Sequence, residues 1–126
     1  MDLGLPGRIL ISQTVEFTAS LQLSDEYFIR IESPFVLESH GKSVAVSPED
    51  GAPETFEPLG ELVGQSITEC NVGSAGSLTV TFESGARLVV EPDDSYEAWT
   101  VTGPGGMMTV CMPGGELAIW GAEAAE

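Results

Sequence analysis

Positively charged residues are scarce in this chain. Only four of its 126 residues are lysine or arginine, against 20 aspartates and glutamates, so the formal net charge is -16. Binding of DNA or RNA requires several lysine or arginine contacts with phosphates, and the four cations are scattered along the chain as Arg8, Arg30, Lys42 and Arg87. The composition therefore excludes a basic nucleic-acid-binding protein.

Long apolar runs are also missing. No stretch approaches the ~20 apolar residues of a membrane-spanning helix, and the N-terminal residues lack the basic and apolar regions of an export signal. The only cysteines, Cys70 and Cys111, are then typical of buried thiols in a reducing compartment, with a disulfide between neighbouring strands as the alternative. We expect a cytoplasmic protein that binds no membrane.

Motifs of catalysis and metal binding are absent from the sequence. His40 is the only histidine, and together with two separated cysteines it matches no zinc spacing. The glycine clusters at 103–106 and 112–115 lie between strand-like segments with no lysine nearby, which predicts hairpin turns rather than phosphate-binding loops. We therefore expect no cofactor, no metal and no catalysis, with an enzyme that uses carboxylates alone as an alternative.

What the chain does contain is a regular alternation of apolar and polar residues. Hydrophobic residues make up 42% of it and charged residues 19%, which indicates a folded protein rather than a disordered acidic one. In the first strand Ile9, Ile11, Val15 and Phe17 are predicted to share the buried face. Such patterns predict a mainly β domain over 1–120, either two antiparallel sheets or a partly open barrel, and a flexible tail at 121–126.

One segment reads as a helix, at about 54–63. Phe56, Leu59, Leu62 and Val63 are spaced by threes and fours, and Gly64 follows as a stop signal. Pro58 is acceptable only in the first helical turn, so a shorter helix is the alternative.

The two halves of the chain resemble each other. LPGRILISQTVEFTASLQL aligns with LVGQSITECNVGSAGSLTV, which matches Gly7 with Gly64 and Leu21 with Leu78. After a short insertion Ile29 and Ile31 match Leu88 and Val90. The alignment predicts two repeated three-stranded units, at 5–34 and 62–92.

Aromatic residues and carboxylates gather near the C-terminal end. The predicted site consists of Tyr96, Trp99 and Trp120, with the methionines Met107, Met108 and Met112 beside them and the carboxylates Asp93, Asp94 and Glu97 just before Trp99. Such aromatics line a ligand pocket or an interface, or else they cap the core. Turn formation is the alternative role of the carboxylates.

The strong negative charge of the chain, together with the lack of a recognisable catalytic motif, favours a protein that acts by binding a partner. An acidic surface attracts a basic protein partner through long-range electrostatics. A homodimer through an edge strand or the Trp120 region is a further prediction. The alternative function is a β module that binds a small ligand near Tyr96, Trp99 and Trp120.

The run DDSYEAWTVTGPGGMMTVCMPGGELAIW, together with RIESPF and LVGQSITE, resembles a family of small uncharacterised bacterial proteins common in high-GC Gram-positive genomes. Its most specific part is the EAW, GPGG and PGGELAIW pattern at 96–120. The family brings no established activity, so the resemblance assigns no catalytic residue. Some members are similar to immunity proteins of toxin systems, which implies an immunity-type or regulatory binder.

Overall fold

The described part of the chain folds into two antiparallel β-sheets. The computed structural model describes residues 3–15, 18–39, 41–46, 57–95 and 97–120. The six-stranded sheet has the order β1 (Leu10–Val15), β2 (Ala19–Leu23), β3 (Phe28–Ile31), β9 (Trp99–Thr102), β10 (Met108–Cys111) and β11 (Leu117–Trp120). The five-stranded sheet has the order β5 (Lys42–Val46), β4 (Phe35–Ser39), β8 (Arg87–Val90), β7 (Leu78–Phe82) and β6 (Ile67–Val72).

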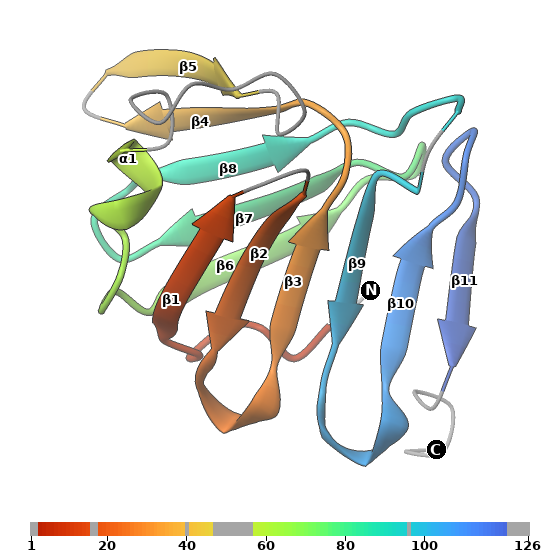
Figure 1. The fold of residues 1–126 in the computed structure, drawn as a ribbon, viewed down its shortest axis with the longest axis horizontal. Coiled ribbons are helices and arrows are strands. Elements are labelled where there is room, and N and C mark those ends of the chain that lie inside the picture. Colours follow the sequence, from red (N-terminus) through yellow and green to blue (C-terminus); the bar gives the residue numbers. More distant parts are fainter. Residues whose placement is uncertain (1–2, 16–17, 40, 47–56, 96, 121–126) are drawn as a thin grey trace.

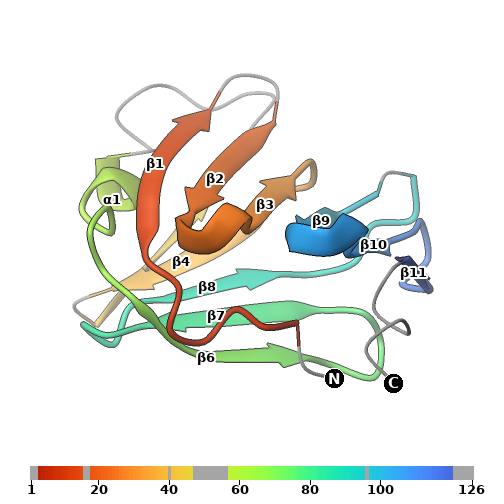
Figure 2. The same ribbon diagram turned by 90° about the horizontal axis from the view of Figure 1, so that it is seen from below.

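The sheets face each other, and the strands of one cross those of the other (Figures 1 and 2). Alternating apolar side chains from both sheets fill the space between them. The prediction of a mainly β fold with two antiparallel sheets is confirmed, and the sheets do not close into a barrel.

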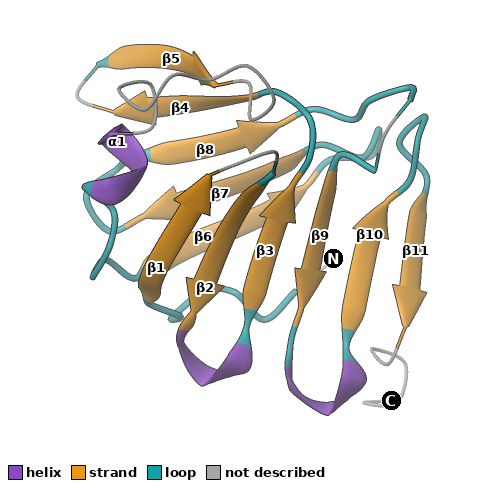
Figure 3. Cartoon of the chain, in the orientation of Figure 1, coloured by secondary structure: helices purple, strands orange, loops and turns teal. Residues whose placement is uncertain are grey.

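Helical structure in the described part of the chain is limited to single turns (Figure 3). The helix predicted at about 54–63 is the short α1 (Glu57–Gly60), and residues 54–56 lie outside the described part. After Gly60 the chain continues as turns, in which Leu62 N–H donates to the Leu59 carbonyl oxygen at 3.0 Å and Val63 N–H to the Gly60 carbonyl oxygen at 3.3 Å. Within the described residues no helix combines the length and apolarity needed to cross a membrane.

Strand β1 differs from its predicted orientation. Leu10 is fully buried, whereas Ile9 and Ile11, which were predicted to face the core, are exposed. A register shift between Leu10 and Ser12 in the pairing of β1 with β2 changes the alternation at this point. Such a β-bulge places one extra residue on the bulged strand, so a strict period of two assigns the wrong face. Phe17 lies outside the described residues.

The segments 5–34 and 62–92 make matching strand pairings in opposite sheets. The first contains β1, β2 and β3, and the second contains β6, β7 and β8, with a register shift in the outer strand of each. Backbone hydrogen bonds join the two segments, and they come in matching pairs. Gly7 N–H donates to Ile67 O and Gly64 N–H donates to Leu10 O, both at 2.7 Å. Ile67 N–H donates to Arg8 O at 2.8 Å, and Leu10 N–H donates to Gln65 O at 3.0 Å. An origin by duplication stays a prediction.

The hairpin after each of these segments crosses to the other sheet. β4 pairs with β8, placing Phe35 opposite Val90, while β9 pairs with β3, placing Trp99 opposite Ile31. β5 then pairs with β4, as β10 pairs with β9. Ten of the described strands therefore follow one approximate twofold arrangement, and β11 has no described counterpart.

The matched pairings move one part of the predicted alignment. Val15 lies opposite Ala19 in the first hairpin, and Val72 lies opposite Leu78 in the second. The strand pairings therefore match Leu78 with Ala19, whereas the sequence alignment matched Leu78 with Leu21. The turn between β6 and β7 is longer, so the insertion falls there rather than after the second strand.

Candidate functional site

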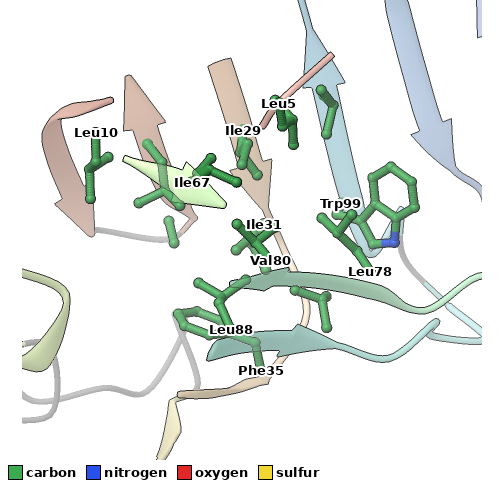
Figure 4. Packing of buried hydrophobic residues seen from close by; sticks show 14 of the residues in the cluster. Leu5, Leu10, Ile29, Ile31, Phe35, Ile67, Leu78, Val80, Leu88 and Trp99 are labelled. Carbon is green, nitrogen blue, oxygen red and sulfur yellow. The ribbon is translucent and has the colours of Figure 1, made fainter. Parts of the chain in front are cut away.

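Trp99 belongs to the core and not to a surface site. It is fully buried on β9, and its side chain lies beside Leu78 between the sheets (Figure 4). Its indole Nε1 donates a hydrogen bond to the Gly76 carbonyl oxygen at 2.9 Å. The buried Cys111 thiol donates to the same oxygen at 3.3 Å. Trp99 therefore fixes the turn between β6 and β7 to the other sheet, and it lines no ligand mouth.

The glycine-rich turn at 112–115 is held by close backbone contacts. A Cβ on Gly115 would overlap the Ala75 carbonyl oxygen, and one on Gly76 would lie 2.5 Å from the Gly115 carbonyl oxygen. Gly114 N–H also donates to the Asp93 carbonyl oxygen at 2.8 Å. The cluster therefore serves as a hairpin turn, as the sequence predicted, and it positions the start of β11.

Trp120 lies at the opposite side of the sheet from Trp99. It belongs to a row of directly opposite residues that crosses four strands. The row runs from Trp120 on β11 through Met108 on β10 and Thr102 on β9 to Phe28 on β3. Trp120 is 51% exposed and Met108 is 37% exposed. Side chains of this row share the outer face of the six-stranded sheet, because residues directly opposite in a pleated sheet point the same way.

The neighbouring row adds further apolar side chains to this face. Val110, which stands opposite Ala118, is buried there without belonging to the core between the sheets. We call the following set the edge patch: Phe28, Met108, Val110, Ala118 and Trp120. The sequence could not separate the two tryptophans, since both follow strand-like alternation and only the sheet pairing decides which face each occupies.

Strand β11 is apolar on both faces. Leu117 and Ile119 point toward the inner face, opposite Cys111 and Thr109. Ile119 is nevertheless 38% exposed, because β11 lies at the margin of the sandwich (Figure 1). The strand contains no charged residue. Sequence reasoning predicted an interface at an edge strand or at the Trp120 region, but it did not identify β11 itself as the edge strand, because the order of the strands in the sheet depends on their pairing.

Carboxylates flank the beginning of β11. The hydrogen bond from Gly114 to Asp93 brings the loop after β8 beside the turn before β11, and Glu116 is the residue directly before the strand. We call Asp93, Asp94, Glu97 and Glu116 the acidic rim. The Asp93 carboxylate accepts a bond from Ser95 N–H at 2.7 Å, which also gives it the predicted turn-forming role. Tyr96 lies outside the described residues.

Most of the few cations are committed elsewhere. Arg8 contacts Asp25 at 2.7 Å, Arg87 contacts Glu38 at 3.3 Å, and Arg30 contacts Glu32 at 3.6 Å. Within the described part of the chain, Asp94, Glu97 and Glu116 take part in no ion pair with these arginines. Negative charge at the start of β11 is therefore left for solvent or for a partner to balance.

A shallow hollow of about 410 Å³ lies away from the predicted aromatics. Its lining residues are Glu38, Ser39, Gly41, Lys42, Ser43, Gly85 and Arg87, from the turns at one end of the five-stranded sheet. His40 lies outside the described residues. Among the residues that are described, no three His, Cys, Asp or Glu side chains converge on a common point. Cys70 and Cys111 do not form a disulfide, so the predicted alternative of a bond between neighbouring strands is wrong.

Comparison with known proteins gives a family and no function. The chain matches no curated protein and no solved structure. A family model described as a family of unknown function, DUF6188, matches residues 1–121. An uncharacterised family, as the resemblance implied, is thus confirmed, while its bacterial origin and its sequence pattern stay predictions. Since the match covers nearly the whole sequence, the chain belongs to this family of unknown function, DUF6188.

Proposed function

We propose that this protein is a non-catalytic binding module that holds a basic protein partner against the edge patch and the acidic rim. One observation carries the proposal: Trp120 is half exposed beside Met108, at the end of an uncharged edge strand. Exposed tryptophans are the residues most enriched among those that dominate binding energies at protein interfaces. Isolated apolar residues on a surface are ordinary, but Met108 and Trp120 are large, exposed and directly opposite each other, and such adjoining exposed apolar side chains indicate an interaction site.

The charge of the chain supports a basic partner. A net charge of -16, with arginines already ion-paired, leaves a field that attracts cations and repels a second copy. The acidic rim places part of this charge directly beside the apolar edge. Electrostatic attraction of this kind increases the association rate and weakens as salt is added.

No observation favours the small-ligand alternative to the same degree. Trp99 is closed off in the core, and it points to the opposite face from Trp120. The two tryptophans therefore cannot line one pocket, and the hollow beside Glu38 and Lys42 lies elsewhere. The immunity-type partner implied by the family resemblance stays one candidate within the protein-binding proposal.

A cationic model peptide tests this proposal. We use a fluorophore-labelled peptide in which a short run of valines is flanked on both sides by lysines, and we measure its binding by fluorescence anisotropy at 20 and 300 mM NaCl. We expect the peptide to bind at low salt and to lose at least about tenfold in affinity at high salt. Trp120→Ala should weaken binding by about 30-fold, as loss of a buried interface tryptophan does.

Two charge-matched variants locate the site on the surface. Asp94→Asn with Glu116→Gln removes two exposed charges of the acidic rim, and Glu26→Gln with Glu69→Gln removes two exposed charges elsewhere. The first pair should weaken binding severalfold more than the second. Equal losses from both pairs, or unchanged binding by Trp120→Ala, would show that the edge of the sheet is not the binding site.

A further inference from the structure

We infer that the partner adds an extended strand to the edge of β11 that pairs with no described strand, an inference that rests on the proposed function and specifies its binding mode. Strand addition to an exposed sheet edge is a recurrent mode of peptide recognition, in which backbone bonds give affinity and alternate side chains give specificity. The structure supports it through the register of β11, the composition of this edge and the charge around it.

The register shows which backbone groups of β11 face outward. Met112 N–H donates to the Glu116 carbonyl oxygen at 2.7 Å, so Glu116 bonds toward β10. On the other side of β10, Met107 accepts from Gly103 N–H at 3.0 Å. Bonding residues alternate along an antiparallel pair, and therefore Ala118 and Trp120 also bond toward β10.

Leu117 and Ile119 consequently direct their N–H and C=O groups away from the sheet. Within the described part of the chain, no hydrogen bond to these four groups is formed. An antiparallel or parallel strand placed here gains their hydrogen bonds without disturbing β10. At about 3.3 Å per residue, a four-residue edge accepts a segment of roughly four to six residues.

The other sheet edges carry features that discourage strand addition, and β11 does not. β1 and β6 each contain a register shift, and β6 also exposes Glu69. β5 begins with the exposed Lys42. Bulges and charges on an edge are the usual means by which proteins prevent pairing with another chain. Only β11 among the described edges is both regular and uncharged.

The surroundings of β11 identify the kind of segment that fits. Side chains of an added strand alternate between the outer face, beside Ala118 and Trp120, and the inner face, beside Leu117 and Ile119. Both faces are apolar, while the acidic rim adjoins the beginning of the strand. The occupant is therefore an extended apolar segment flanked by lysine or arginine, and not a second copy of a chain with a charge of -16.

Removal of one edge N–H tests the inference. Ile119→Pro deletes the outward N–H at an edge position where proline is tolerated, and Ile119→Ala is the matched control that shortens the side chain and keeps the N–H. With the lysine–valine peptide we expect Ile119→Pro to lose at least about tenfold in affinity and Ile119→Ala less than about threefold. Circular dichroism checks that both variants are folded.

A second variant keeps the test decisive if proline prevents folding. Cys111 allows ligation of a synthetic 111–126 peptide that carries N-methyl-Ile119 to the rest of the chain. This change removes the same N–H and retains every side chain, so the same loss of affinity is expected. Hydrogen exchange on the unmodified protein should show that peptide binding slows exchange of the Leu117 and Ile119 amides by at least about tenfold.

The outcomes separate this inference from the proposed function. If Trp120→Ala abolishes binding while N-methyl-Ile119 binds as the unmodified chain does, the function stands and strand addition is wrong. If neither change affects binding, both are wrong. Sedimentation measures whether the protein forms a dimer and whether that dimer binds the peptide. A dimer that does not bind the peptide would identify a second copy as the occupant and overturn the inference.

Discussion

At the scale of single residues, the Gly76 carbonyl oxygen is one of the points at which polar contacts join the two sheets. It accepts hydrogen bonds from the Trp99 indole and from the Cys111 thiol, both of which are buried. Burial raises the pKa of the Cys111 thiol above its ordinary value, because the thiolate would lose its hydration. The thiol therefore stays a neutral donor in the folded protein.

This shift predicts a loss of stability in alkali. Below the ordinary thiol pKa of 9.0 the thiol is protonated in both states, so its contribution is complete. Above that pH the unfolded chain ionises while the folded chain does not, and the free energy of unfolding falls as pH rises toward the folded pKa. We measure the free energy of unfolding of the native chain and of Cys111→Ala in urea at pH 7 and pH 10. The native chain should exceed the variant by a smaller free energy at pH 10 than at pH 7. A difference that does not change with pH would contradict this assignment.

At the scale of elements, the turn before β11 docks on the turn between β6 and β7 with no space for a side chain. Gly115 has a φ of 98° and lies against the Ala75 carbonyl oxygen. Gly114 has a similar φ of 89°, but a Cβ there would meet nothing within 4 Å. The two neighbouring glycines thus share a backbone conformation and differ in their contacts.

Gly115→Ala should destabilise the protein more than Gly114→Ala. The left-handed backbone alone costs about 1–2 kcal/mol, and forced overlap in a packed contact adds about 1–3 kcal/mol for Gly115. Chemical denaturation of the two variants measures the difference directly. Equal free energies of unfolding would mean that the two turns do not touch as described.

The two matched segments meet where Ile9 forms a bridge with Ser66. Ser24 Oγ accepts from Ile9 N–H at 2.9 Å, and Glu83 Oε1 accepts from Ser66 N–H at 2.7 Å. The two side chains therefore occupy corresponding positions on either side of one junction.

Replacement of either side chain at this junction should have a measurable and coupled effect. Ser24→Ala and Glu83→Ala should each lower the free energy of unfolding by about 0.5–1.5 kcal/mol, the usual net value of a hydrogen bond. Because both act on one bridge, the double variant should depart from additivity by at least about 0.5 kcal/mol. Ser43→Ala, at an exposed position of β5, is the control and should change stability little. Strict additivity would show that the segments are energetically independent.

At the scale of the whole molecule, charge repulsion opposes folding. A net charge of -16 over 126 residues is only partly balanced by the described ion pairs, and salt screens such repulsion. We expect the melting temperature to rise by about 3–5 °C between 20 and 500 mM NaCl, which corresponds to roughly 1 kcal/mol at this size. Sucrose at matched osmolality controls for non-ionic effects, and a melting temperature that falls with salt would contradict the expectation.

The strand content could be predicted from the sequence because alternation of apolar and polar residues is a local property. The same reasoning was wrong for the face of Ile9 and Ile11, because a bulge depends on the partner strand. It also predicted a helix longer than α1, since spacing by threes and fours does not distinguish an α-helix from the consecutive turns that follow Gly60. For the candidate site it did not separate the buried Trp99 from the exposed Trp120, and the functional role of this region stays a prediction.

The amino-acid sequence by itself determined the mainly β fold, the glycine turns and the acidic character of this protein, because each follows from residue type and short-range spacing. Only the tertiary structure decided that β11 is an uncharged edge, that Trp120 faces outward beside Met108, and that the acidic rim adjoins them. These properties depend on which strands become neighbours, and pairing between strands distant in the chain is set by the packing of the two sheets as a whole.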